Sequence, residues 1–208
     1  MKKSYNHLLA GIFIMFSLLA QTANADVNQS DPVKLVEELT SGILKELAEK
    51  QDAFVADPSK AAEFGRNYIL PYVDNYKMSR YVVGRKWKTA TQQQQDDFVQ
   101  AFTDTIINSY SRSLVKLKIA GVEVVKSLSK RRGRSSVVTV ATQKNGTKVD
   151  VIYRLFQSKK NQKWYIYDFS VEGISLLVNY RKTFASEISK KGLDQVILNM
   201  QNGLKESL

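Results

Sequence analysis

Residues 137–171 read VVTVATQKNGTKVDVIYRLFQSKKNQKWYIYDFSV, and this stretch decides the fold. A β-branched run comes first, and apolar residues then alternate along the chain from Val149 to Leu155. Between them, Asn145-Gly146 predicts a two-residue type I′ hairpin, because both residues accept a positive φ. A polar loop at 158–163 then leads into an aromatic run. The pattern predicts three consecutive antiparallel strands.

Upstream of this stretch, the period of the apolar residues changes from 3.6 to 2 near Gly121. Val122, Val124 and Leu128 then begin an earlier strand. Short loops join all these strands, and such loops connect antiparallel rather than parallel neighbours. We therefore expect a sheet of four strands, or five, in an antiparallel meander.

Helical patterns stand on both sides of the strands. Asp31-Pro32 is typical of a helix start, with Asp as the N-cap and Pro in the first turn. Thr91 and Gln94 form a capping box at the head of the longest helix, and two closing helices follow Gly173. Helices, then strands, then helices, without βαβ alternation, predict an α+β fold with a helical layer on one face of the sheet. Nothing divides residues 26–208 into more than one domain.

The first 25 residues have the pattern of a cleavable signal peptide. Lys2 and Lys3 precede an apolar run at 8–20, and Ala23-Asn24-Ala25 is the small-x-small pattern that precedes cleavage. A membrane anchor is the alternative, but the run is shorter than the roughly 20 residues that span a bilayer. We expect cleavage after Ala25 and export of the remaining chain.

Composition argues against an enzyme. The chain has no cysteine, and its one histidine, His7, lies in the signal segment. These absences remove thiolate chemistry, imidazole-assisted hydrolysis and the usual zinc ligands. Asp168 and Glu172 are close in sequence, but a structural role beside a turn suits them better than acid–base catalysis. We expect no catalytic residues, no metal and no cofactor.

The exported chain is strongly basic, with 29 Lys and Arg against 20 Asp and Glu. Such a charge suits polyanionic partners, and export argues against nucleic acid. Basic residues gather at 126–134 and at 159–163, in two connections that a meander places at the same end of the sheet. They form either one patch for anionic lipid or an acidic partner, or simply two solvated loops.

Residues 164–184, WYIYDFSVEGISLLVNYRKTF, resemble the signature of the MlaC family, also called the toluene-tolerance or Tgt2 family. That signature is an aromatic strand ending in Tyr-Asp, then Glu-Gly-(Val/Ile)-Ser and Asn-Tyr-Arg. Upstream, 69–74 (ILPYVD) and 84–87 (GRKW) resemble further family motifs, as Gly192-Leu193-Asp194 does near the end. Tyr165 departs from the pattern, because the family often has Lys there. The similarity runs in order through nearly all of the exported chain.

The resemblance implies a monomeric periplasmic phospholipid carrier that maintains the lipid asymmetry of an outer membrane. Its partners would be an outer-membrane lipoprotein–porin complex and an inner-membrane ABC transporter with an MCE subunit. Two alternatives stay open. One is an exported basic adaptor that docks on anionic membrane or protein without lipid cargo, and the other is a small hydrolase, which the missing histidine disfavours.

The resemblance also implies a lipid cavity between the sheet and the helices. We expect acyl chains to contact apolar residues on one sheet face and on the facing helices, with Ile174 as the leading candidate. Each position is equally compatible with ordinary core packing. The predicted contacts are Phe102, Ile106, Tyr110, Val138, Val140, Val149, Val151, Tyr153, Ile174 and Leu177.

Overall fold

The computed structural model describes residues 26–116 and 118–205 and confirms the α+β class. The helices are α1 (Pro32–Ala56), α2 (Pro58–Phe64), α3 (Asn75–Val83), α4 (Gln92–Lys116), α5 (Leu176–Lys191) and α6 (Leu193–Lys205). Short helical turns are η1 (Gly65–Ile69), η2 (Leu70–Tyr72) and η3 (Gly84–Lys88). The proposed signal peptide lies outside the described residues. Within those residues, every helix is too short or too polar to cross a membrane.

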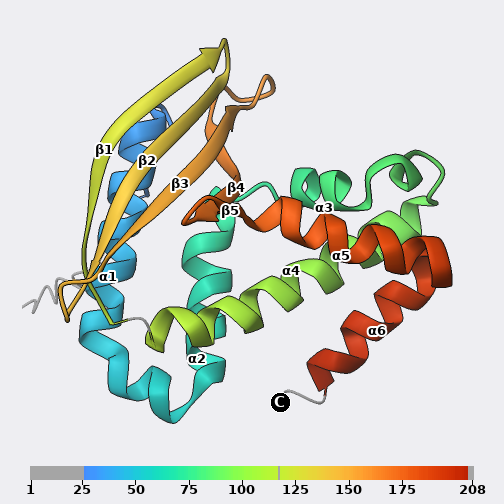
Figure 1. Ribbon diagram of the computed structural model, residues 1–208, viewed down its shortest axis with the longest axis horizontal. Helices are drawn as coiled ribbons and strands as arrows, with labels where there is room; N and C mark the ends of the chain where they lie inside the picture. The colour runs from blue at the N-terminus through green and yellow to red at the C-terminus, as the bar shows by residue number, and fades with distance from the viewer. Residues whose placement is uncertain (1–25, 117, 206–208) are drawn as a thin grey trace, which may run out of the picture.

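The strands form one antiparallel sheet in sequence order, as Figure 1 shows. They are β1 (Ile119–Arg131), β2 (Arg134–Gln143), β3 (Lys148–Gln157), β4 (Trp164–Val171) and β5 (Ile174–Ser175). The predicted meander is therefore confirmed, with five strands. β1 is an edge strand, and its pairing with β2 is interrupted by three register shifts, between Ile119 and Gly121, Val124 and Lys126, and Leu128 and Arg131.

The predicted type I′ turn between β2 and β3 is wrong, although the hairpin itself is present. Of the two central residues only Gly146 has a positive φ, 86°. The amide of Gly146 donates to the carbonyl of Gln143 at 2.9 Å, so the turn spans one residue more than predicted. The Asn145 side chain accepts from the amide of Thr147 at 3.0 Å. This local bond supports Asn145 in an ordinary conformation, and the glycine alone takes the left-handed one.

Two helix starts follow the sequence closely. The Asp31 carboxylate accepts from the amides of Val33 and Lys34 at 2.8 and 3.0 Å. Thr91 and Gln94 exchange reciprocal side-chain-to-amide hydrogen bonds of 3.1 and 3.0 Å. Both caps satisfy amides that the first helical turn leaves without partners.

The strand register assigns each residue to one of two sheet faces, because directly opposed residues share a face. On the inner face, Val137, Tyr153 and Phe169 form one row, and Thr139 and Val151 lie in the next. Helix α1 packs against this face. The core that it forms there contains Leu35, Val36, Leu39, Val137, Leu155 and Ile166.

A second core lies beyond the sheet, among α3, α4, α5 and α6 (Figure 1). Its aromatic centre is Phe98, Phe102 and Phe184, with ring centroids 5.7 to 6.1 Å apart. The helical layer thus has two parts. One part is α1 on the sheet. The other, which we call the helical body, consists of α3, α4, α5 and α6, and its helix α5 directly follows β5.

Asp168 joins the sheet to this helical body. Its buried carboxylate accepts from the Arg154 guanidinium on β3 at 2.8 Å and from the Ser175 hydroxyl at 2.7 Å. It also accepts from the amide of Leu177 in the first turn of α5 at 3.1 Å. The Ser175 hydroxyl in turn accepts from the amide of Val178 and so caps α5. These contacts confirm the structural role that the sequence predicts for Asp168.

Asp168→Ala should lower the free energy of unfolding by about 3 kcal/mol, because it leaves a partly buried arginine and a helix-terminal amide without their acceptor. Urea denaturation monitored by circular dichroism measures this. Asp52→Ala, at an exposed position on α1, is the control and should change stability by less than about 0.5 kcal/mol. Equal stability of the two variants would show that the junction contributes little.

Candidate functional site

Part of the inner sheet face is not covered by α1. Val151 on β3 lies opposite Val171 on β4, and Val171 lies opposite Ile174 on β5. These three residues form an apolar strip across the last three strands. The strip reaches solvent, because Val171 is exposed and Ile174 is 70% exposed. Val149, one alternation before Val151, extends it along β3.

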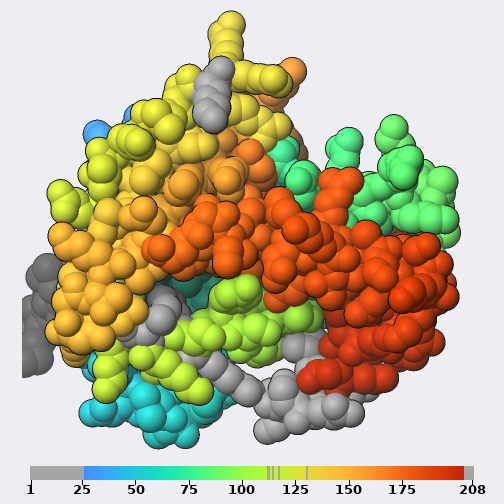
Figure 2. Space-filling model, in the orientation of Figure 1, coloured from blue at the N-terminus to red at the C-terminus, as the bar shows by residue number. Residues whose placement is uncertain are grey.

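Helix α4 approaches the sheet beside this strip, through Tyr110. The Tyr110 ring meets Phe169 edge to face, with centroids 5.8 Å apart. Tyr110 is itself exposed, and Ile106, one turn earlier, packs against the helical core. Figure 2 shows the surface hollowed between the orange β3–β5 region and the yellow-green α4. We call this site the apolar recess and define it by Tyr110, Val151, Phe169, Val171 and Ile174.

The tyrosines around the recess are partly shielded from water. Burial raises the pKa of Tyr153 on the inner sheet face to about 12. Burial, together with the neighbouring Tyr110 phenol, raises the pKa of Tyr180 on α5 to about 12. The pKa of Tyr110 is also raised, chiefly by burial. These hydroxyls therefore stay neutral at physiological pH and can only donate or accept hydrogen bonds.

Among the described residues, no group of three or more histidine, cysteine or acidic side chains is placed so that it could hold a metal ion. Apolar side chains and neutral phenols suit an uncharged, largely hydrocarbon ligand.

Residues 37–202 match the family model described as MlaC protein. The chain belongs to the MlaC family. A relative from Haemophilus influenzae, the intermembrane phospholipid transport system binding protein MlaC, is 23% identical over 195 residues, covering 92% of this chain and 89% of the relative. A solved phospholipid-binding protein from Ralstonia solanacearum, in complex with a phospholipid, has a TM-score of 0.75 and 22% identity. That match covers 88% of this chain and 99% of the other, so the two share a fold.

Two predicted lipid contacts of this MlaC-family chain do not share the face of the others. Val138 lies opposite Ile152, and Val140 lies opposite Asp150. Both therefore point away from the face that carries Val151, so the expectation of a single shared face is wrong for them. The physical reason is local, because the run VVTV has β-branched residues at every position and its composition does not mark either face.

Two other predicted contacts lie in the core of the helical body. Phe102 is 0% exposed and Leu177 is 2% exposed. Phe102 meets Tyr180 edge to face, with centroids 5.2 Å apart, so it lies behind the residues that reach the recess. The direct contact of either residue with lipid remains a prediction, as it does for all ten positions.

Sequence reasoning missed Phe169, Val171 and Tyr180. Phe169 and Val171 alternate along β4, so the period-2 pattern contained a signal for them. A second feature weakened that signal, because Tyr167 is an extra residue in the pairing with β3 and shifts the alternation. Tyr180 lies on a helix whose exposed and buried faces only the tertiary structure defines.

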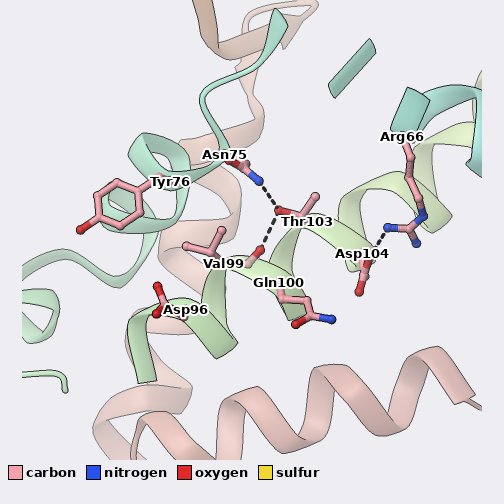
Figure 3. A pocket seen from close by; sticks show the side chains of 8 residues that line it. All are labelled: Arg66, Asn75, Tyr76, Asp96, Val99, Gln100, Thr103 and Asp104. Atoms are coloured by element: carbon pink, nitrogen blue, oxygen red, sulfur yellow. Dashed lines mark hydrogen bonds and ion pairs between the residues drawn. The ribbon is translucent and has the colours of Figure 1, made fainter. Parts of the chain in front are cut away.

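A separate surface pocket of about 400 Å³ lies between α3 and α4 (Figure 3). Most of the residues that line it have polar side chains, and three of them, Arg66, Asp96 and Asp104, are charged. Arg66 and Asp104 form an ion pair there, and the Asn75 amide donates to the Thr103 hydroxyl at 3.1 Å. None of its lining residues belongs to the recess, and their polarity does not suit hydrocarbon.

The raised pKa of Tyr153 predicts a loss of stability at high pH. The unfolded chain releases this proton near pH 10 and the folded chain near 12, so stability is full below 10 and falls as the pH rises toward 12. The contribution is up to about 1.4 kcal/mol per pH unit. Urea denaturation between pH 9 and 12 should therefore give a shallower decline for Tyr153→Phe than for wild type. Tyr81→Phe, which alters an exposed phenol, should follow wild type, and equal slopes for both variants would contradict burial of Tyr153.

Proposed function

We propose that this chain is a periplasmic phospholipid carrier and that acyl chains enter the apolar recess. One observation carries the proposal: Val171 and Ile174 are exposed neighbours on β4 and β5, and the exposed Tyr110 of α4 contacts Phe169 on the same face of β4. Contiguous exposed apolar surface commonly marks a binding site. Phospholipid as the ligand class is supported by the Haemophilus relative, a phospholipid transport system binding protein, and by the Ralstonia protein, which was solved with a bound phospholipid.

The energetics of lipid transfer fit such a site. Moving an acyl chain from a bilayer into water costs roughly 0.8 kcal/mol per CH₂, so two chains cost well over about 10 kcal/mol. A carrier must replace that burial with apolar protein surface. The strip from Val151 to Ile174, with Phe169 beside it on β4 and Tyr110 of α4 against Phe169, supplies surface of this kind.

Release requires that the headgroup be held weakly. The tyrosines beside the recess, Tyr110 and Tyr180, offer neutral phenols, whose hydrogen bonds are weaker than those of charged side chains. Glu172, between Val171 and Ile174, is an exposed carboxylate and would repel a headgroup phosphate. Asp168, the buried carboxylate nearest in sequence to the recess, is already engaged by Arg154, Ser175 and Leu177. We infer a binding protein without catalytic activity that releases its cargo intact.

The direction of transfer would come from partners. We propose that the signal peptide is removed after Ala25 and that the protein moves as a monomer. It would exchange lipid with an outer-membrane lipoprotein–porin complex and with an inner-membrane ABC transporter that has an MCE subunit. The Haemophilus relative's description as part of an intermembrane transport system supports this assignment.

Native mass spectrometry of protein purified without detergent tests the function. The expected spectrum shows the mature chain together with a mass increment of a phospholipid, which extraction and lipid analysis then identify. A mature chain of apo mass only, after gentle purification from cells, would contradict the carrier function.

Ile174→Glu should empty the recess, because a carboxylate at its edge is incompatible with an acyl chain. The fold should persist, because the residue is mostly exposed. The matched control is Val55→Glu, which places the same charge at a 64% exposed valine on α1. Native mass spectra should show lipid on the control and little on Ile174→Glu. Full occupancy in both would place the lipid elsewhere.

A further inference from the structure

The positive charge of this protein is concentrated in its sheet. Residues 118–175 contain twelve Lys and Arg and four Asp and Glu, which gives a net charge of +8. Residues 26–116, which form the first four helices, contain twelve basic and thirteen acidic residues. The excess positive charge of the exported chain therefore lies almost entirely in residues 118–175, so charge is distributed very unevenly over the molecule.

Within the sheet, the charge gathers at one end. The β1–β2 turn and the β3–β4 turn lie side by side, because the amide of Gln157 donates to the carbonyl of Gly133 at 3.1 Å. The expectation that both basic connections lie at one end is thus confirmed. Figure 1 shows this end projecting away from the helical body. We call it the basic tip and define it by its exposed cations: Arg131, Arg132, Arg134, Lys159, Lys160 and Lys163.

The cations of the basic tip are not neutralised within the described part of the chain. The ion pairs among the described residues join Lys50 to Glu46, Arg66 to Asp104 and Arg154 to Asp168, and none of them includes a residue of the basic tip. Arg134 instead lies over the rings of Phe156 and Tyr167, 5.6 and 5.1 Å from their centroids. Aromatic faces hold a guanidinium in place and leave its charge available.

We propose that the basic tip docks this protein on the surface of an anionic lipid bilayer. Each Lys or Arg near such a surface contributes roughly 1 kcal/mol of attraction. The tip projects from the rest of the molecule, as Figure 1 shows. Half of its cations are lysines, a residue that protein–protein interfaces disfavour. A bilayer needs neither a fitted pocket nor a fixed set of acceptors, so its charge complements the tip better than a folded acidic partner would.

The docked geometry separates attachment from cargo. Strand β3 runs from Val149 beside the recess to Gln157 at the tip, a span of roughly 25 Å. A protein held by its tip therefore keeps the recess well above the membrane surface. Docking retains the protein beside a membrane, while lipid transfer takes place at the other end of the sheet.

Vesicle flotation at low salt tests the proposal. Wild-type protein should bind vesicles of phosphatidylcholine mixed with phosphatidylglycerol, and it should not bind vesicles of phosphatidylcholine alone. Raising the salt to about 1 M should release it, because the Debye length falls to about 3 Å. The triple variant Lys159→Gln, Lys160→Gln, Lys163→Gln should bind at least about tenfold more weakly.

The matched control removes three exposed lysines at the far end of the helical body: Lys86→Gln, Lys88→Gln, Lys190→Gln. It should bind within about twofold of wild type. An equal loss in both triple variants would show that net charge alone acts, and equal binding to neutral vesicles would show apolar insertion. If the wild-type protein does not bind anionic vesicles at low salt, an acidic protein becomes the better candidate for the partner of the tip. Each of these results overturns the proposal.

Native mass spectrometry of the same preparations keeps this inference distinct from the carrier function. The tip variant should retain the lipid occupancy of wild type, because its substitutions lie far from the recess. Conversely, Ile174→Glu should still bind anionic vesicles. A tip variant that loses its lipid together with its vesicle binding would show that the two are one process.

Discussion

The carboxylate of Asp168 joins the two halves of this structure by charged hydrogen bonds, beside the apolar packing of Val73, Tyr167 and Phe169 between them. On one side is a sheet whose core is formed with α1, and on the other is a helical body with its own aromatic core. One buried side chain accepts from β3, from β5 and from the start of α5. Because charged hydrogen bonds in a dry setting depend steeply on geometry, this contact fixes where α5 leaves the sheet. The distance between the last strands and α4, and with it the shape of the recess, follows from that exit.

The inner face of the sheet has one part that α1 covers and another part that is open to solvent. Where α1 covers it, apolar residues such as Val137 and Leu155 are fully buried and stabilise the fold. Where it passes beyond α1, residues of the same chemical kind stand open, as Ile174 does. Leaving apolar surface in water forgoes roughly 25 cal/mol for each Å² that could have been buried. On the covered part of this face, burial raises the pKa of Tyr153 to about 12.

Local chemistry in the sequence was enough for the elements and their order. The caps at Asp31 and Thr91 and the alternation along β3 each depend on neighbours within a few residues, and each was predicted. Face assignments for Val138 and Val140 depend on a pairing register, which an unbroken β-branched run does not encode. Phe102 and Leu177 were placed in the site, although the packing of four helices buries them. The recess residues on β4 were missed because a single extra residue at Tyr167 displaces the alternation. Sequence patterns thus pointed to the sheet and to α4, which carry the proposed recess, while long-range packing decides which of their side chains reach it.

The three register shifts along β1 have a consequence for how the protein behaves at high concentration. A straight outer strand presents a regular row of amides and carbonyls on which another chain can be added. On β1 the row is broken after Ile119, after Val124 and after Leu128, so that no long segment keeps a regular spacing. The protein has exposed apolar residues near β5, and the irregular spacing of β1 at the opposite edge of the sheet opposes the addition of further strands there.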